Sequence, residues 1–410
     1  MAKTIYLDNG ATTKVDKKAI EAMLPFFDNV FGNPSSNHEF GFSAQDAVND
    51  ARSSIAKSIG AKSDEIIFTC GGTEANNHAV KGVAWANKER GNHIITVKTE
   101  HKAILNVCKW LENQGFITTY LDVDKEGFVN SEDLKKAITP ETILVSIMHA
   151  NNEIGTIQNL EELGAICKEN KILFHSDACQ SYTKVDIDVN KQNLDLVSLN
   201  SHKIHGPKGV GALYVRKGTK IDNLFHGGSQ ENAMRAGTEN VPGIVGFAEA
   251  VRQSSKDKHI AYMKKIQNKL IDSVLETYEH SERKGENVSK RIEGTILNGP
   301  KGDSRLCNNV NISFKGIEGE AIGGLLDQNF VASSTGSACS SASLDPSYVL
   351  KAIGLTDEEA NGSLRITLSR DTTEEEIDRV IKLIPNIVKK LRRISPFGKL
   401  LKKLSIGSKE

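Results

Sequence analysis

The chain has 410 residues, and its 52 Lys and Arg residues balance its 52 Asp and Glu residues. A formal charge of zero argues against a nucleic-acid-binding protein, which carries a net basic field. With 38% hydrophobic and 25% charged residues, the composition is that of a folded chain rather than a disordered one. The length predicts about two or three domains around a large buried core.

Segments that would direct the chain to a membrane are not visible in the sequence. No apolar run approaches the roughly 18 residues that a membrane span needs. The first residues, 1–8, lack the apolar stretch of a signal peptide. We therefore expect a cytoplasmic protein with neither a membrane nor a nucleic acid as its partner.

The cysteines indicate neither a zinc site nor a disulfide framework, because they are scattered and form no C-x-x-C pair. In a reducing cytosol we expect free thiols, and most of them are typical of small buried apolar residues. Cys339 is the exception, for reasons given below. The six are Cys70, Cys108, Cys167, Cys179, Cys307 and Cys339.

From about residue 65, apolar runs alternate with segments of helical spacing. This alternation predicts an α/β fold whose mainly parallel sheet has helices on both faces. The predicted strands are Glu65–Thr69, His93–Val97, Thr142–Ile147, Ile172–Ser176 and Asp195–Leu199, and helices are predicted over Ala103–Gln114 and Leu160–Glu169.

After about residue 255 the pattern changes. A long helical stretch over Gly243–Glu276 leads into a charged, turn-rich patch at 281–287. The elements that follow predict a second, smaller α/β domain, so we expect a large domain over 16–255 and a small domain made of 1–15 and 256–410. These elements are a strand over Asn309–Phe314, a helix over Glu318–Asp327, a strand over Ser363–Leu368 and a helix over Thr373–Arg393.

Polar residues follow several predicted strands, where open parallel sheets bind their ligands. They are His101, Asn152 with its neighbour Glu153, Asp177 with Gln180, and Lys203. A glycine-rich turn, Cys70–Glu74, also lies between a strand and a helix. Such a turn presents free N–H groups and the positive end of a helix dipole to an anion, although an ordinary turn would have the same sequence.

An Asp and a later Lys at neighbouring strand ends favour pyridoxal phosphate as a cofactor. A lysine amine forms a Schiff base with an aldehyde, and a carboxylate beside the pyridine nitrogen keeps that nitrogen protonated. Taken singly, Asp177 could cap a helix and Lys203 could be a surface residue. Together with a phosphate-sized anion site at the glycine-rich turn, they make a stronger case.

At these residues the chain resembles the cysteine desulfurases, pyridoxal-phosphate enzymes with the aspartate aminotransferase fold, fold type I. The resemblance covers most of the chain, to about Arg370, and implies a large domain with a mainly parallel seven-stranded sheet. The matching stretches are residues 6–13, 72–77, 100–102, 149–155, 177–180, 202–209, 235–238 and 334–341.

The resemblance implies a role for each matching residue. Lys203 would carry the cofactor, Asp177 would pair with its pyridinium nitrogen, and His101 would stack on its ring and assist proton transfer. Arg365 would bind the substrate carboxylate, with Asn152 nearby. The other cofactor contacts would come from Gly72, Thr73, Asn152, Gln180, Asn200, Ser201, His202 and, from the second subunit of an obligate homodimer, Thr238.

Cys339 lies among Gly, Ser, Thr and Ala residues with no apolar pattern, which is typical of an exposed loop. The resemblance implies that Cys339 takes the sulfur of L-cysteine as a persulfide, releases L-alanine, and passes the sulfur to an acceptor such as an iron–sulfur scaffold. A bystander thiol is the alternative. No intrinsic metal site is expected, although Cys339 could join a partner in holding a transient iron–sulfur cluster.

Other functions stay open at this point. A selenocysteine lyase, an aminotransferase or another enzyme of the same fold would not need a nucleophile in a serine-rich loop. A non-catalytic assembly subunit should have lost Lys203, Asp177 or His101, and all three are present. The basic segment 389–403 is either a solvated helix face or a docking surface for an acidic partner, and the sequence leaves the sulfur acceptor open.

Overall fold

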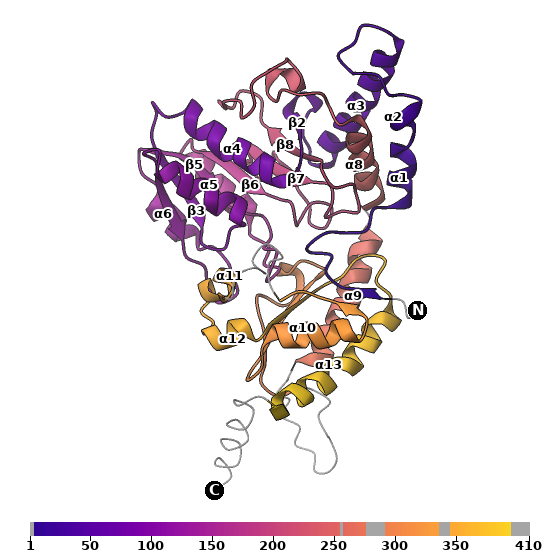
Figure 1. The fold of residues 1–410 in the computed structure, drawn as a ribbon. Helices are drawn as coiled ribbons and strands as arrows, with labels where there is room; N and C mark the ends of the chain where they lie inside the picture. The colour runs from indigo at the N-terminus through magenta and orange to yellow at the C-terminus, as the bar shows by residue number, and fades with distance from the viewer. Residues whose placement is uncertain (1–3, 255–256, 276–291, 336–344, 395–410) are drawn as a thin grey trace.

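The computed structural model describes residues 4–254, 257–275, 292–335 and 345–394. A seven-stranded sheet and its helices form the upper part of the molecule in Figure 1, and two smaller sheets with their helices form the lower part. Within these ranges, no helix combines the length and the apolar character needed to cross a membrane. The basic tail beyond Ile394 lies outside the described residues.

The large sheet has the strand order β2-β8-β7-β6-β5-β3-β4. Its neighbours pair in parallel from β4 through β7, while β8 runs antiparallel to both β7 and β2. The predicted seven-stranded, mainly parallel sheet is therefore confirmed. The strands are β2 (Ile66–Thr69), β3 (His93–Val97), β4 (Ile117–Leu121), β5 (Thr142–Ser146), β6 (Leu173–Asp177), β7 (Leu196–Asn200) and β8 (Gly211–Val215).

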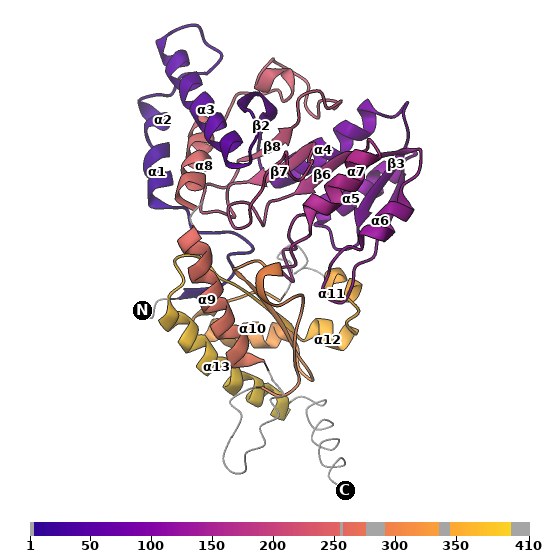
Figure 2. The ribbon, with the colours of Figure 1, turned by 180° about the vertical axis from the view of Figure 1, so that it is seen from behind.

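Helices cover both faces of this sheet because its central strands are apolar on both sides (Figures 1 and 2). In β3, for example, Ile94 packs in the core beneath α4 and α5, and Ile95 packs in the core beneath α3, α7 and α8. The helices are α1 (Lys17–Met23), α2 (Pro25–Asp28), α3 (Glu39–Ser58), α4 (Gly72–Ala86), α5 (Lys102–Glu112), α6 (Ser131–Ala137), α7 (Leu160–Glu169) and α8 (Val241–Ser254).

Two strands of the large sheet, β4 and β8, were not predicted from the sequence. The edge strand β4 is partly exposed and carries two threonines, so it lacks the continuous apolar run of a central strand. The strand β8 follows a glycine-rich stretch and begins at Gly211, which resembles a turn in the sequence.

The smaller part of the molecule has its own core. An antiparallel sheet of order β12-β10-β9 lies beside a parallel pair formed by β1 and β11. This core contains Leu7, Leu270, Ile312 and Ile366. Because Leu7 is among them, the N-terminal segment packs in the smaller part of the molecule. The elements are β1 (Ile5–Tyr6), α9 (Asp257–Val274), β9 (Thr295–Leu297), β10 (Asn309–Phe314), α10 (Gly319–Gln328), β11 (Val331–Ala332), α11 (Tyr348–Ala352), α12 (Asp357–Asn361), β12 (Ser363–Thr367) and α13 (Glu374–Ile394).

The long helical stretch predicted over Gly243–Glu276 is described as two helices, α8 and α9, on either side of residues 255–256, which lie outside the described residues. Their apolar faces serve different cores: Phe247 of α8 packs under the large sheet, and Leu270 of α9 packs in the smaller core. A helical period predicts each helix but not which core it faces. The domain boundaries at 16 and 255 stay a prediction.

Replacing Leu7 with Ala should destabilise the protein by about 2 to 5 kcal/mol, because the side chain is fully buried and its removal leaves a cavity. Equilibrium unfolding in urea measures this change. Ile394→Ala is the control, since Ile394 is 72% exposed and should change the free energy of unfolding by less than about 0.5 kcal/mol. Equal effects of the two substitutions would contradict the placement of the N-terminal segment.

Candidate active site

The polar residues singled out from the sequence lie at one edge of the large sheet. The strands β2, β3 and β5 lead into Gly72, His101 and Asn152, while β6 ends at Asp177 and β7 ends at Asn200. Because β8 is antiparallel to both of its neighbours, β2 points the same way as the parallel strands. All five strands therefore deliver their carboxyl ends to the same edge, as predicted for a ligand site.

The turn between β2 and α4 carries little side-chain volume, so a ligand can come close to its backbone. An ideal Cβ on Gly72 would lie 2.5 Å from Sγ of Cys179, so a larger residue does not fit without a shift of that side chain. Gly71 has a φ of 154° and offers no side chain to cap α4. Thr73 is exposed beside them. The first N–H groups of α4 thus lie at a turn with little side-chain bulk, which suits a phosphate.

Asp177 is buried, and both of its carboxylate oxygens are held. The side-chain amide of Asn76 in α4 donates to Oδ2 at 2.7 Å, and the backbone N–H of Cys179 donates to Oδ1 at 2.9 Å. Asn76 was not predicted as a site residue. A carboxylate fixed at the end of β6 is suited to pair with a cationic nitrogen of a bound ligand.

Lys203 is half-buried, and its amine donates to the backbone carbonyl of Ala11 at 2.8 Å and to that of Gly10. Gln180 donates to the same Gly10 carbonyl at 3.1 Å, so Lys203 and Gln180 meet at the N-terminal segment. Burial, followed by the positive charge of Arg365, lowers the pKa of Lys203 to about 8. A buried amine that loses its proton near neutral pH is suited to act as a nucleophile or base.

The residues just before Lys203 shape the loop after β7. Oδ1 of Asn200 accepts from the backbone N–H of Lys203 at 3.3 Å. The hydroxyl of Ser201 is fully buried and has no hydrogen-bond partner among the described residues. His202 lies 3.2 Å from Oγ1 of Thr12 through Nδ1, and burial lowers its pKa to about 4. His202 is therefore neutral at physiological pH.

Arg365 in β12 of the smaller part contacts Asn152, which follows β5 of the large sheet. The Arg365 guanidinium donates to Oδ1 of Asp8 at 3.0 Å and to the backbone carbonyl of Asn152 at 3.2 Å. Nε of Arg365 and Oδ1 of Asn152 are buried without a hydrogen-bond partner among the described residues. The site therefore keeps one cationic donor and one acceptor for a ligand.

His101 is the N-cap residue of α5, and its Nδ1 accepts from the backbone N–H of Ala103 at 3.1 Å. An accepting Nδ1 places the proton of the neutral ring on Nε2.

Among the described residues, one sequence-predicted residue does not join this group. Thr238 is exposed and lines a separate cavity with Cys70, Gly209 and Arg235. Cys339 lies outside the described residues. The contacts of Asp8, Gly10 and Asn76 were missed because only the long-range packing of the chain brings them to the strand ends.

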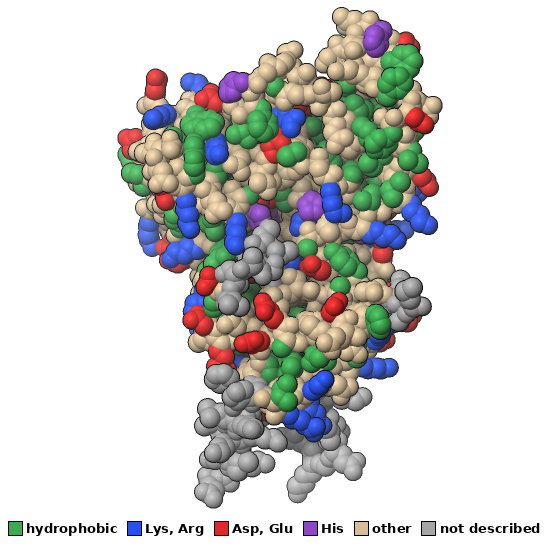
Figure 3. Space-filling model, in the orientation of Figure 1, with side chains coloured by type: hydrophobic (Ala, Val, Ile, Leu, Met, Phe, Trp, Pro, Cys, Tyr) green, Lys and Arg blue, Asp and Glu red, His purple; other side chains and the backbone are tan. Residues whose placement is uncertain are grey.

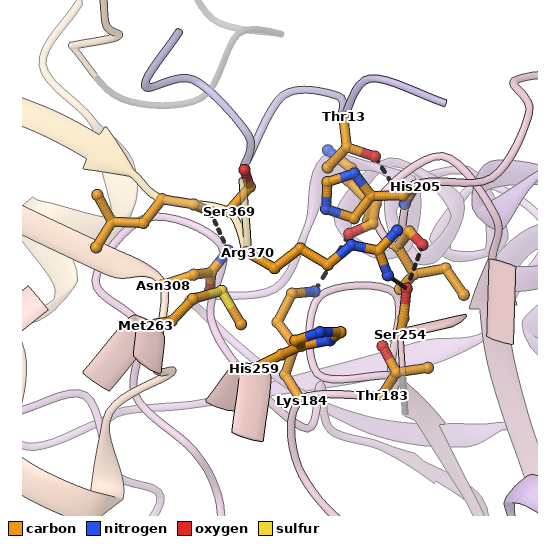
Figure 4. Close-up of a pocket in the computed structure, with 13 residues that line it drawn as sticks. Thr13, Thr183, Lys184, His205, Ser254, His259, Met263, Asn308, Ser369 and Arg370 are labelled. Carbon is orange, nitrogen blue, oxygen red and sulfur yellow. Dashed lines mark hydrogen bonds between the residues drawn. The ribbon is translucent and has the colours of Figure 1, made fainter. Parts of the chain in front are cut away.

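A cavity beside the Lys203 backbone is bordered by Lys184, His205 and Arg370 (Figure 4). The amine of Lys184 donates to the carbonyl of Gln180 at 2.8 Å and to that of Lys203 at 3.3 Å. Burial lowers the pKa of Lys184 to about 8. Lys184 therefore supports the loop that carries Lys203 and was not predicted from the sequence.

The family model described as aminotransferase class-V matches residues 5–380. The chain belongs to this family. A cysteine desulfurase, IscS, from Clostridium botulinum is 51% identical over 399 residues, which are 97% of each protein. A solved NifS-like protein is 38% identical with a TM-score of 0.85, covering 95% of this chain and 100% of that one. A structure described as SspA in complex with cysteine is also 38% identical, with a TM-score of 0.79 and coverages of 90% and 100%.

These relatives place the chain among the cysteine desulfurases of the class-V family, which use pyridoxal phosphate. The residues present fit this cofactor. The turn at Gly72 leaves room for a phosphate, the buried hydroxyl of Ser201 lacks a partner among the described residues, and Asp177 and Lys203 supply a carboxylate and a deprotonatable amine. The predicted fold and cofactor are confirmed, and the individual residue roles stay predictions.

Addition of pyridoxal phosphate to the cofactor-free protein should be faster at higher pH until about pH 8. Only the neutral form of the Lys203 amine reacts with the aldehyde of the cofactor. With a pKa of about 8, roughly one-tenth of the amine is neutral at pH 7. For an ordinary lysine the neutral fraction at pH 7 is less than about one in a thousand. The rate of appearance of yellow colour between pH 6 and 10 measures this. Arg365→Gln removes one cause of the lowered pKa and should move the midpoint upward, whereas a rate that climbs steadily to pH 10 would contradict the buried amine.

Proposed function

We propose that this chain is a cysteine desulfurase that converts L-cysteine to L-alanine and keeps the sulfur as a persulfide on Cys339. The observation that carries the proposal is the buried amine of Lys203 at the strand edge that also holds Asp177. Membership in the family, with relatives named cysteine desulfurase, supports the same activity. The structure described as SspA with cysteine supports cysteine as the substrate.

The cofactor would be held by groups at the ends of three strands. The turn at Gly72 and Thr73, together with Asn200, Ser201 and His202, would bind the phosphate, and Gln180 would donate to the phenolic oxygen of the ring. Asp177 would pair with the ring nitrogen. Once bound, pyridoxal phosphate withdraws electrons from the Cα of the amino acid and so weakens the bonds around it.

The side chains then orient the substrate and move protons. Arg365 would hold the substrate carboxylate with its guanidinium, whose Nε has no partner among the described residues, and Asn152 would lie beside it. Nζ of Lys203 would take the α-proton, for which its lowered pKa is suited. His101 would exchange a proton at Nε2, because Nδ1 is occupied by the backbone of Ala103.

The sulfur step needs no oxidant. The thiolate of Cys339 attacks the substrate sulfur, the substrate Cβ–S bond breaks, and a new S–S bond forms on Cys339. The electron pair of the broken bond stays on the carbon side, where a proton is added to give alanine. The sum of the atoms is cysteine plus protein thiol giving alanine plus protein persulfide.

The persulfide sulfur would then go to an acceptor protein, for which an iron–sulfur scaffold is the first proposal. A transient cluster shared between Cys339 and that partner would need ligands from the partner, and the described residues contain no group of three or more potential metal ligands. The cytoplasmic location stays a prediction.

We also propose that the protein is a homodimer in which Thr238 contacts the cofactor phosphate of the other subunit. An apolar patch supports this proposal: six large apolar side chains over α1–α3 are between 44 and 64% exposed, and hydrophobic side chains gather there at the upper right of Figure 3. Patches of this kind mark interaction surfaces. The six are Ile20, Leu24, Phe27, Phe31, Phe40 and Phe42.

Incubating the yellow protein with L-cysteine should release alanine and add one sulfur to the peptide that contains Cys339. Mass spectrometry detects the sulfur, and borohydride reduction should fix the cofactor on Lys203. Cys339→Ala should lower alanine formation by at least about a hundredfold while the protein stays yellow. A Cys339→Ala protein that releases sulfide at the full rate would favour another enzyme of this fold, and a colourless protein would favour a non-catalytic subunit.

The double substitution Phe27→Ser/Phe31→Ser should raise the dissociation constant of the dimer at least about tenfold, because exposed aromatic side chains dominate many interfaces. Light scattering over a dilution series measures it. Ile117→Ser is the control, since Ile117 is 58% exposed on the edge strand β4, away from the patch. A fully active monomer would defeat the proposed dimer.

A further inference from the structure

The turn after β5 joins the large sheet to the smaller one. Oδ1 of Asn151 accepts from the backbone N–H of Glu153 at 2.8 Å and of Ile154 at 3.0 Å, which fixes the turn. The carbonyl of Glu153 then accepts from the side-chain amides of Asn309 and Asn311, each at 3.0 Å. The strand β10 of the smaller part is thus attached to the turn that carries Asn152.

The segment that begins α11 is attached to the same turn. The hydroxyl of Ser347 donates to Oε2 of Glu153 at 2.6 Å, and Glu153 is almost fully buried. The hydroxyl of Tyr348 donates to the carbonyl of Glu100 at 2.7 Å. Glu100 directly precedes His101, so both bonds end beside residues of the candidate site.

The chain on the other side of Cys339 is attached through Arg365. The backbones of Ser334 and Arg365 pair as a short antiparallel bridge with N···O distances of 2.7 and 3.1 Å, and the hydroxyl of Ser363 donates to the carbonyl of Thr335 at 3.0 Å. The side chain of the same Arg365 donates to the carbonyl of Asn152. The two attachments therefore converge on the adjacent residues Asn152 and Glu153.

We propose that Glu153 is a positioning residue, which holds the downstream attachment of the Cys339 segment while Arg365 holds the upstream one. This inference rests on the proposed role of Cys339 as the sulfur acceptor. Cys339 follows Thr335 by four residues and precedes Ser347 by eight. The described residues on both sides of Cys339 are thus attached, through Arg365 and Ser347, to the turn that carries Asn152 and Glu153.

The double variant Ser347→Ala/Tyr348→Phe removes both downstream hydrogen bonds. We expect kcat for alanine formation to fall about tenfold, because a displaced reacting group costs rate, while KM for cysteine changes less than about twofold. Thr356→Ala is the matched control: Thr356 is the N-cap of α12, as Ser347 is of α11, but it bonds Glu359 instead of the turn. The control should keep kcat.

A second measurement does not depend on turnover. Iodoacetamide labelling of the loaded protein, read by peptide mass spectrometry, gives the rate for Cys339 relative to the exposed Cys70. This ratio should change at least about threefold in the double variant. In Glu153→Ala, which removes only the Ser347 bond, it should change in the same direction by a smaller factor, and in Glu153→Gln, which keeps an acceptor for Ser347, it should stay near that of the unmodified protein.

The inference fails if the double variant keeps both kcat and the labelling ratio. It also fails if kcat falls only in step with lost cofactor colour, since that result assigns a purely structural role. If the unmodified protein makes no alanine from cysteine, the proposed function fails, and the labelling ratio still decides whether Glu153 positions the segment.

Discussion

The burial of the Lys203 amine constrains the whole molecule. An amine has to lose contact with water for its pKa to fall, yet its N–H groups still need acceptors. The backbone carbonyls of Gly10 and Ala11 supply them, 193 and 192 residues away in the sequence. These carbonyls belong to a segment that starts as a strand of the smaller sheet. The environment of Lys203 therefore exists only when the two parts of the chain are packed together.

Arg365 depends on the same N-terminal segment. A buried guanidinium without an anion is costly, and Asp8 provides that anion at 3.0 Å. A second N–H group of the Arg365 guanidinium donates to the backbone carbonyl of Asn152, which belongs to the large-sheet part of the molecule. Both cationic side chains of the site are thus anchored by residues 8 to 11, so the segment that links the two sheets also orients the groups proposed to hold the cofactor and the substrate carboxylate.

The sequence predicts the parts of this site that depend on local pattern. Apolar runs locate the strands, and the residues after them, from Gly72 to Lys203, lie at one sheet edge because parallel strands share a direction. The contacts of Asp8 and Asn76 were not predictable in this way. Asp8 contacts Arg365, which is 357 residues away in the sequence, and Asn76 contacts Asp177 from the helix α4. The spacing of apolar residues in the sequence predicts neither contact.

The thiols of the chain show how burial selects a nucleophile. Reaction with sulfur needs a thiolate, and a raised pKa keeps a thiol protonated. Burial raises the pKa of Cys108 and Cys167 to about 12 and that of Cys307 to about 11, and it raises that of Cys179 further above the ordinary range. Cys70 is more exposed, but partial burial and the carboxylate of Glu74 raise its pKa to about 11. The raised pKa values keep all five described thiols protonated at neutral pH, so each of them is a poor nucleophile for sulfur.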